Sequence, residues 1–329
     1  MKSRTLALSV AAVALAAVSC SKSPSGLRTP EDLHQIRVSP TVVAETKGEY
    51  TLATVESFDL LIDNPRNSRY SYTNTRFTKD ESGKWVSATP MLWEKPAGEK
   101  QAVSLLAISP ALPTGGHAIG DDPIMEIEIE PTQSADSRAS DYLYCSIGDT
   151  DWGNDSQQWS TRFNSVGELR LNFMHAVSKL RIEVMFGTDL NFDGPMTESP
   201  VTNLKVGGTK LKGNYKKDPA GGGYIVETVA SSIGETAPFL VEWQPAADRN
   251  DRSRAVYECM IIPQNFVKLN LSFEMGGMPY TWESTASNLE FHTGKRHTLP
   301  ISIGKDGVIV GKITTTPWDD GGEKDIETN

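Results

Sequence analysis

The sequence predicts an all-β protein with two tandem antiparallel β-sandwiches. Apolar and polar residues alternate with a period of two over many short runs, which is the pattern of strands with one buried face. Clusters of Gly, Pro, Asn and Asp separate these runs, and no amphipathic helix longer than about two turns is evident. Many short strands between turn signals are typical of antiparallel sandwiches, and the length favours two of them.

The composition is that of an ordinary globular protein. Of 329 residues, 38% are hydrophobic and 22% are charged, which excludes a wholly disordered chain, a collagen-like chain and a polytopic membrane protein. The formal net charge is -10, with 42 acidic against 32 basic residues. Sequence-independent binding of nucleic acid needs clustered Lys and Arg against phosphates, so this balance argues against a nucleic-acid partner.

The N-terminus reads as a lipoprotein signal peptide, residues 1–19. Basic residues precede an apolar run over 6–18, which is too short to cross a bilayer about 30 Å thick as a permanent helix. Small residues directly before Cys20 resemble a lipobox, in which the Cys thiol is acylated and becomes the new first residue. We therefore expect an exported outer-membrane lipoprotein anchored through Cys20, with residues 20–34 as a flexible tether. The alternative is a plain secretory signal with an incidental Cys.

Alternation also places the strands after the tether. In 266–274 the residues Val267, Leu269, Leu271 and Phe273 share one face, and in 125–130 three Glu side chains share the solvent face. Strands are expected at 54–62, 102–108, 125–130, 141–147, 224–229, 238–243, 255–262, 266–274, 297–303 and 307–315.

Two cysteines besides Cys20 lie in strand-like runs. No CxxC pair is present, so neither a zinc site nor a redox dithiol is indicated. We expect Cys145 and Cys259 to be buried free thiols in different domains, with a disulfide between them as the alternative.

The stretch 168–186, ELRLNFMHAVSKLRIEVMF, changes its phase in the middle. Leu169, Leu171 and Phe173 share one phase, whereas the apolar residues from Leu180 onward occupy the other. A one-residue slip reverses every side chain of a strand. The strand therefore needs a bulge or sharp bend near Ser178, or it passes from one core into another.

Within this stretch, FMHAVSKLRI at 173–182 resembles the F-x-H-A-hydrophobic-S-K-L strand of the fimbrillin family of exported lipoprotein pilins. Further segments resemble the family's motifs in the expected order: 36–40 and 45–47, Trp93, AISP at 107–110, DYLY at 141–144, LEFHTGKRHTL at 289–299 and GVIVGKITTTPW at 307–318. The positions matched as structural motif residues are Phe173, His175, Ser178, Lys179, Leu180, Gly294, Lys295 and Trp318.

The resemblance implies two transthyretin-like, Greek-key sandwiches, at 35–167 and 168–329, with the Phe173 strand opening the second and a polar tail at its end. It implies a structural subunit or adhesin of surface fimbriae that needs no cofactor. The implied partners are other fimbrial subunits, in a homo- or hetero-polymer, and host or bacterial surface ligands.

The family mechanism implies strand donation. A protease removes the lipidated leader and the first strand, and an extended segment of the next subunit fills the vacated groove by pairing with its backbone. The cut follows a basic residue, usually Arg, just before the first retained strand. The candidates here are Lys47, Arg37 and Arg28. The more plausible donor is Val308–Thr316, whereas 319–329 reads as a trailing polar tail.

Enzyme chemistry is not indicated. The sequence has no HExxH, G-x-S-x-G, P-loop or dinucleotide fingerprint. His175 lies in an apolar phase, so we expect a buried, hydrogen-bonded structural histidine. His292 and His297 flank a turn and are expected in a solvated hairpin. The loop Asp149–Asp155 lacks the Gly and closing Glu of a calcium loop and reads as a polar loop, so no metal is expected.

Tryptophans support the alternative function, a surface glycan-binding lipoprotein of a polysaccharide-uptake system. Trp152 and Trp159 lie in a polar sequence, where exposure and sugar stacking are plausible. Trp93 has a place in the resembled sandwich, so core packing is expected for it.

Overall fold

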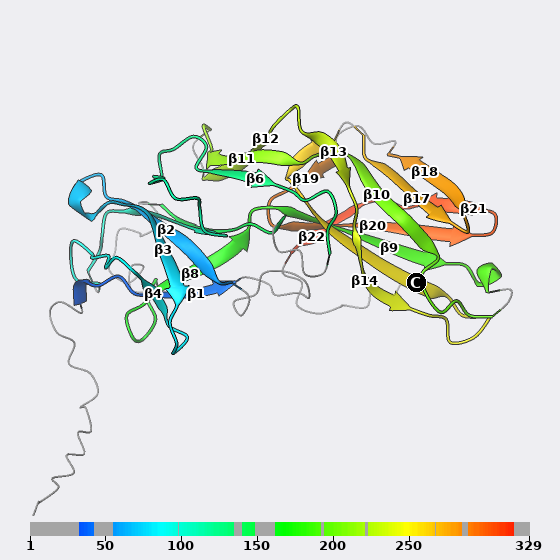
Figure 1. Cartoon of the computed structure of the whole chain (residues 1–329), viewed down its shortest axis with the longest axis horizontal. Coiled ribbons are helices and arrows are strands. Elements are labelled where there is room, and N and C mark those ends of the chain that lie inside the picture. The colour runs from blue at the N-terminus through cyan, green and yellow to red at the C-terminus, as the bar shows by residue number, and fades with distance from the viewer. Residues whose placement is uncertain are drawn as a thin grey trace, which may run out of the picture.

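The computed structural model is an elongated molecule made almost entirely of β-strands, so the predicted all-β class is confirmed (Figure 1). Short 3-10 helices occur at Ser68–Tyr70 (η1) and Thr188–Leu190 (η4). The structure describes residues 33–42, 55–97, 99–134, 140–148, 162–191, 194–220, 223–266, 268–284 and 289–318. Outside the described residues lie the signal peptide, Cys20, Arg28, Lys47, the loop Asp149–Asp155 with Trp152, Trp159 and the tail 319–329.

One seven-stranded sheet occupies the N-terminal end of the molecule. Its strand order is β1-β8-β7-β5-β2-β3-β4, and every neighbouring pair is antiparallel except β1–β8, which is parallel. The strands are β1 (Val38–Val42), β2 (Ser57–Asp63), β3 (Tyr72–Lys79), β4 (Trp85–Ser87), β5 (Ser104–Ser109), β7 (Leu143–Ile147) and β8 (Leu169–His175).

Two sheets face each other at the other end. The four-stranded sheet has the order β13-β10-β17-β18, and the six-stranded sheet has the order β14-β15-β9-β20-β21 with β22 also on β20. Their strands are β9 (Ser178–Phe186), β10 (Val201–Lys210), β13 (Ile233–Thr236), β14 (Phe239–Gln244), β15 (Ser253–Ile261), β17 (Asn270–Met275), β18 (Met278–Glu283), β20 (Lys295–Gly304), β21 (Gly307–Val310) and β22 (Thr314–Pro317).

A small sheet joins the two ends. In it β6 (Met125–Glu128), from the N-terminal part of the sequence, pairs with β11 (Lys212–Lys217), which pairs in turn with β12 (Tyr224–Thr228). A further two-stranded sheet pairs β16 (Gln264–Phe266) with β19 (Leu289–Phe291).

Three apolar clusters fill these layers. The N-terminal core is enclosed by the seven-stranded sheet and includes Phe58, Phe77 and Phe173. The C-terminal core lies between the four- and six-stranded sheets and includes Leu180. The bridging core lies between the other face of the seven-stranded sheet and the β6–β11 sheet, and it includes Trp318. The apolar surface buried in these three clusters is the main contribution to the stability of the fold.

The predicted change of phase is a passage from one core to another. Phe173 on β8 is 1% exposed in the N-terminal core, and Leu180 on β9 is fully buried in the C-terminal core. Between them, Ala176 and Val177 lie in the bridging core.

The strand that carries Phe173 does not open a second sandwich, because its backbone pairs with β1 and β7 of the N-terminal sheet. The boundary expected at residue 168 therefore falls one strand before the chain changes sheets.

Two further expectations need correction. The sheets are not purely antiparallel, because β1 pairs with β8 and β9 pairs with β20 in parallel. The strand expected at 307–315 is divided into β21 and β22. Pro300 on β20 has no N–H to offer at that point of the ladder, and the Gly311 N–H instead donates to the Pro300 carbonyl at 2.8 Å.

Both thiols are free and buried, as expected. Cys145 lies in the N-terminal core and Cys259 in the C-terminal core. Burial raises the pKa of the Cys145 thiol to about 11, and it also raises that of Cys259, so neither is a reactive thiolate at neutral pH.

Candidate functional site

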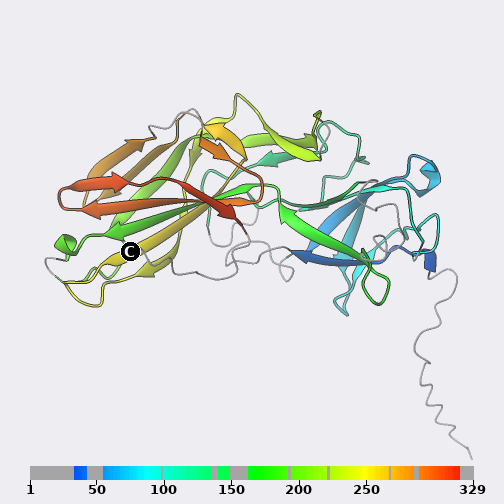
Figure 2. The ribbon, with the colours of Figure 1, turned by 180° about the vertical axis from the view of Figure 1, so that it is seen from behind.

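Strand β1 forms one edge of the seven-stranded sheet, and within the described part of the chain it pairs only with β8. The register runs from Val38 opposite Leu169 to Val42 opposite Phe173, and the two strands lie side by side in both views (Figures 1 and 2). Its alternation decides which side chains face inward: Val38 is 5% exposed, and Pro40 is buried as well. Just before the strand, Ile36 is 4% exposed, so this edge strand supplies several side chains to the N-terminal core.

A groove of about 490 Å³ runs along this strand. Residues 35–40 form one wall, residues 83–87 around β4 form the other, and Phe77 contributes apolar surface. Since β1 and β4 stand at opposite ends of the strand order, the sheet curls until its two edges face one groove. Trp85 on β4 packs against Phe58 with ring centroids 5.0 Å apart, so the groove borders the core directly.

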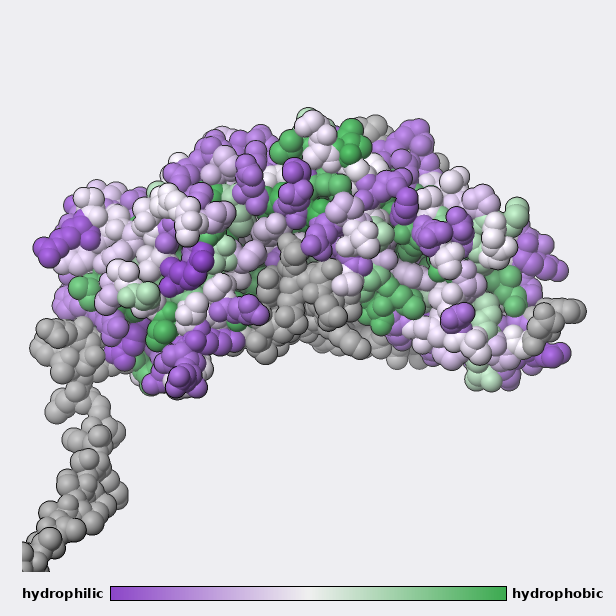
Figure 3. All heavy atoms as spheres, in the orientation of Figure 1, coloured by the Kyte–Doolittle hydropathy of each residue, from purple (hydrophilic) through white to green (hydrophobic). Residues whose placement is uncertain are grey.

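The exposed apolar surface elsewhere on the described residues is dispersed. In Figure 3 hydrophobic residues form small patches separated by hydrophilic ones. Exposed large apolar side chains come from separate strands: Ile309 on β21 (73%), Ile233 on β13 (69%) and Met278 on β18 (62%). Single exposed apolar residues are normal on soluble proteins. Strand β1 differs from these single residues, because its backbone lies at a sheet edge and the segment 36–38 supplies side chains to the N-terminal core.

The three candidate cleavage residues differ in their relation to β1. Arg37 directly precedes the strand, is half-buried, and its carbonyl accepts a hydrogen bond from the Leu169 N–H at 2.8 Å. Lys47 follows β1 in the sequence, whereas Arg28 precedes it, and both lie outside the described residues. A cut after Arg28 or Arg37 would leave β1 on the mature chain, whereas a cut after Lys47 would separate it.

Six of the eight motif residues converge where the chain passes from β8 to β9. We call this place the motif junction: His175, Ser178, Lys179, Gly294, Lys295 and Trp318. His175 is 2% exposed, its Nδ1 lies 2.7 Å from an Asp141 carboxylate oxygen, and its ring is stacked on that of Trp318 with centroids 3.9 Å apart. The expected buried, hydrogen-bonded histidine is confirmed.

Lys179 brings a buried charge to the motif junction. Its Nζ lies 3.4 Å from a Glu258 carboxylate oxygen and 5.0 Å from the centre of the Trp318 ring, so the ammonium has an ion pair and a cation–π contact. Glu258 also accepts a hydrogen bond from Arg181 at 2.9 Å. Burial lowers the pKa of Lys179 to about 8, although the negative charge of Glu258 acts in the opposite direction.

The remaining motif residues tie this junction to β20. The Ser178 hydroxyl donates to the His292 carbonyl at 2.7 Å, and the Gly294 N–H donates to the Val177 carbonyl at 3.0 Å. Gly294 has a φ of 63°, which residues with a Cβ adopt only with strain. Next to it, Lys295 begins β20 opposite Pro317. Phe173 and Leu180 instead point into the two large cores on either side.

His297 was expected in a solvated hairpin, but it is buried. It is 1% exposed, its Nε2 accepts the His292 N–H at 3.2 Å, and its Nδ1 lies 3.0 Å from the Thr315 hydroxyl. Burial lowers its pKa to about 4. The His297 side chain points inward because alternation on β20 places it in phase with Leu299 and Ile301, a signal already present in the sequence. His292 is exposed, as predicted.

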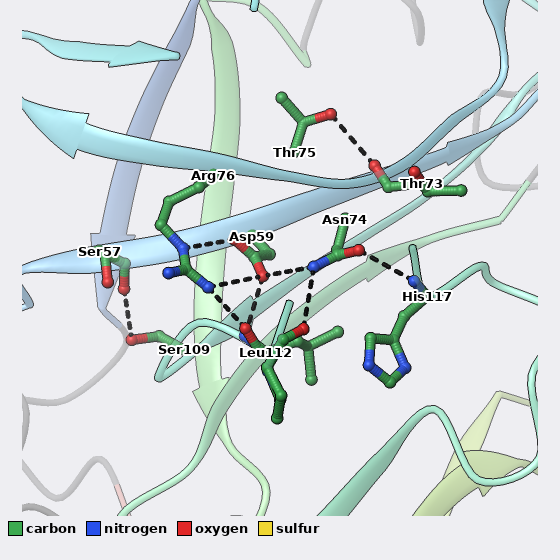
Figure 4. A network of polar contacts seen from close by, with 10 residues as sticks. Ser57, Asp59, Thr73, Asn74, Thr75, Arg76, Ser109, Leu112 and His117 are labelled. Atoms are coloured by element: carbon green, nitrogen blue, oxygen red, sulfur yellow. Dashed lines mark hydrogen bonds and ion pairs between the residues drawn. The ribbon is translucent and has the colours of Figure 1, made fainter. Parts of the chain in front are cut away.

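A buried carboxylate in the N-terminal sheet is held by structural partners. Asp59 on β2 accepts hydrogen bonds from Arg76 (3.2 Å), from Asn74 (3.2 Å) and from the Leu112 N–H (2.9 Å), as Figure 4 shows. Asn74 in turn accepts the His117 N–H at 2.9 Å. With its oxygens engaged in this way, Asp59 fastens the segment 112–117 to β2 and β3.

Other kinds of site are not found in the part of the chain that the structure describes. No group of His, Cys, Asp or Glu there is arranged to hold a metal ion. No helix among those residues has the length and apolar character needed to cross a bilayer. Trp93 is 2% exposed in the N-terminal core, as expected.

Sequence reasoning missed several partners. The partners beside the groove are Trp85 on β4 and Phe77 on β3, both far from β1 in the sequence. At the motif junction, the partners are Asp141, just before β7, and Glu258 on β15. A polar residue between buried neighbours, as in Tyr257-Glu258-Cys259, is the signal that could have indicated Glu258, because a buried acid needs a charged partner.

The sequence model of the fimbrillin-like family matches residues 45–318, most of the chain, and the protein therefore belongs to the fimbrillin-like family. No curated protein sequence compared with the chain matches it.

Among solved structures, a candidate cell adhesion protein from Bacteroides ovatus is similar with a TM-score of 0.56 at 12% identity, over 86% of this chain and 97% of that one. A second, from Bacteroides uniformis, has a TM-score of 0.53 at 14% identity, over 86% and 98%. A fimbrial protein from Bacteroides vulgatus has a TM-score of 0.49 at 14% identity, over 87% and 99%. The first two similarities show a shared fold.

Proposed function

We propose that this fimbrillin-like protein is a structural subunit or adhesin of surface fimbriae that assembles by strand donation. The observation that supports it is the position of β1, an edge strand that pairs only with β8 among the described residues. It places Val38 in the N-terminal core, Ile36 directly before it belongs to the same core, and Pro40 is buried. Removal of this strand would leave β8 with unpaired backbone groups beside open apolar sockets. A strand from another subunit can satisfy both by β-augmentation.

The cut that vacates the groove is assigned to Lys47. Of the candidates, Lys47 alone follows β1, so cleavage after it separates the strand from the mature chain. In this proposal the accepting unit extends to β8, and the donating unit begins with β9.

The donor is assigned to the segment Val308–Thr316, which spans the edge strands β21 and β22. On β21 the side chains alternate: Val308 and Val310 are half-buried, whereas Ile309 is exposed. Residues spaced by two are what a vacated edge position needs, because Ile36, Val38 and Pro40 have the same spacing.

Export through acylation of Cys20 would place the precursor on the outer membrane and the cut subunit in a fimbrium. The similarity to candidate cell adhesion proteins supports a role at the cell surface, with surface ligands as further partners. A chain that stays uncut keeps its lipid and would serve as an anchor.

N-terminal sequencing of the protein from its native envelope tests this function, together with gels of unboiled samples. Polymers should appear as ladders whose subunits start at Gly48. Lys47→Gln should abolish the ladders, whereas the matched variant Arg37→Gln should keep them. Ladders that persist in Lys47→Gln, or subunits that start at Val38, would overturn the assignment of the cut. Monomers alone, whether or not the chain is cut, would overturn assembly by strand donation.

A further inference from the structure

The side chains of the C-terminal ribbon, residues 307–318, differ in how far they are buried in their own molecule. It consists of β21, the connection 311–313 and β22, and it runs along β20 (Figure 2). Most of its side chains are exposed or half-buried, including those of Thr314–Pro317. Within residues 307–318 the single buried side chain is that of Trp318, which is 3% exposed.

Trp318 does not pack where the rest of the ribbon packs. Val308, Val310 and Ile313 lie against the C-terminal core, whereas Trp318 belongs to the bridging core. Its indole lies flat on the His175 ring with an interplanar angle of 5°, and the Lys179 ammonium faces the same indole. The backbone N–H of Trp318 donates to the Gly294 carbonyl at 3.3 Å.

We propose that Trp318 is the anchor that retains the C-terminal ribbon on its own molecule, and that withdrawal of its indole from the motif junction frees the ribbon. This inference rests on the proposed function, because it takes the ribbon as the donor. The anchoring role itself concerns the uncut monomer and can be measured without any polymer.

The physical argument is a comparison of contacts along the ribbon. The backbone hydrogen bonds of β22 to β20 lie at an exposed edge, where water can replace them at small net cost. The Thr315 hydroxyl adds one contact to His297. Burial of the Trp318 indole stabilises the attached ribbon more than these hydrogen bonds do, since large aromatic side chains bury the most apolar area.

Withdrawal also has a compensating effect at the motif junction. Lys179 is 1% exposed, its ammonium faces the indole, and burial is unfavourable to the charged form. Once the indole leaves, water can reach that ammonium, which offsets part of the lost contact energy. The anchor is therefore strong enough to hold an exposed ribbon and yet reversible.

Amide hydrogen exchange of residues 311–318 in the uncut full chain tests the anchor. Trp318→Ala should accelerate exchange at β22 by about tenfold or more, and Trp318→Phe, which keeps a ring on His175, should lie between it and wild type. The matched ribbon variant Thr315→Val should stay within about threefold of wild type. The control variant Trp93→Phe, in the N-terminal core, should change amide exchange at β22 no more than it changes exchange at other exposed edge strands.

The anchor is overturned if Trp318→Ala exchanges no faster at β22 than Thr315→Val, or if Trp93→Phe accelerates β22 equally. Should the alanine variant not fold, Trp318→Phe decides, since wild-type exchange at β22 in that variant contradicts the anchor. Faster exchange in the monomer without ladders in the envelope would uphold the anchor and overturn strand donation. Ladders in the envelope together with unchanged exchange at β22 in Trp318→Ala would uphold strand donation and overturn the anchor.

Discussion

Lys179 shows what a single buried charge does at the motif junction. The residue is 1% exposed, and its ammonium is paired with Glu258 at 3.4 Å and faces the ring of Trp318. A buried ion pair is weak evidence for stability, because removal of the charges from water costs much of what their attraction returns. The lowered pKa of Lys179 reports that cost directly.

Replacement of this residue by a similar apolar side chain is expected to change how stability depends on pH. The pKa of Lys179 is about 8 in the folded chain and near 10.5 when unfolded, so the unfolded chain holds more protons on this group between those values. The free energy of unfolding of wild type should therefore rise from pH 8 to pH 10 relative to Lys179→Met, by about 1–3 kcal/mol. Urea unfolding of both chains over this range measures the difference, and parallel curves would contradict the prediction.

Strand β1 shows how an edge strand can be both part of a core and removable. Its backbone has one neighbour, and that neighbour is parallel, whereas central strands such as β2 pair on both sides. Its inward residues Val38 and Pro40 are nevertheless buried. Departure of β1 therefore breaks its pairing with β8, together with the backbone hydrogen bonds that join the preceding residues 33–36 to 91–97.

Two neighbouring positions of β1 should respond differently to the same substitution. Val38 faces the core and Ser39 faces outward, so Val38→Asp buries an unpaired carboxylate and Ser39→Asp does not. We expect Val38→Asp to lower the free energy of unfolding by about 2–4 kcal/mol and Ser39→Asp by less than about 1 kcal/mol. Urea unfolding of the uncut chain measures both values. Equal effects would mean that β1 does not contribute to the core as described.

The two ends of the molecule are connected by more than a linker. The bridging core takes residues from both ends, and β6 of the N-terminal part pairs with β11 of the C-terminal part. Gln133 also exchanges two hydrogen bonds with the backbone of Met260, at 2.7 and 2.9 Å. Such shared contacts favour unfolding as one cooperative unit.

Calorimetry should therefore show one thermal transition for the uncut chain. Leu60→Ala removes a fully buried side chain from the N-terminal core, and Ile182→Ala removes one from the C-terminal core. Each is expected to lower the unfolding free energy by about 2–5 kcal/mol and to move the same single transition. Two transitions, each sensitive to only one of the variants, would contradict this coupling.

Much of the fold could be predicted from the alternation of apolar and polar residues along the sequence. The inward residues of β8 and β9 follow from a period of two, and so does the reversal of phase between Phe173 and Leu180. Alternation could not decide between a bulge and a passage from one core to another, because that choice depends on which strands lie beside β8 and β9. It also could not show that Pro300 divides the last strand, since the division arises on the neighbouring strand.

Patterns along the chain were enough to predict the all-β class, the inward faces of most strands, the buried His175 and the family to which the chain belongs. Tertiary structure alone decided that β8 joins the N-terminal sheet, that β1 and β4 border one groove, and that Trp318 lies against His175 and Lys179. The reason is physical: side-chain phase is a property of neighbouring residues, whereas strand pairing and core contacts join residues that are distant along the chain.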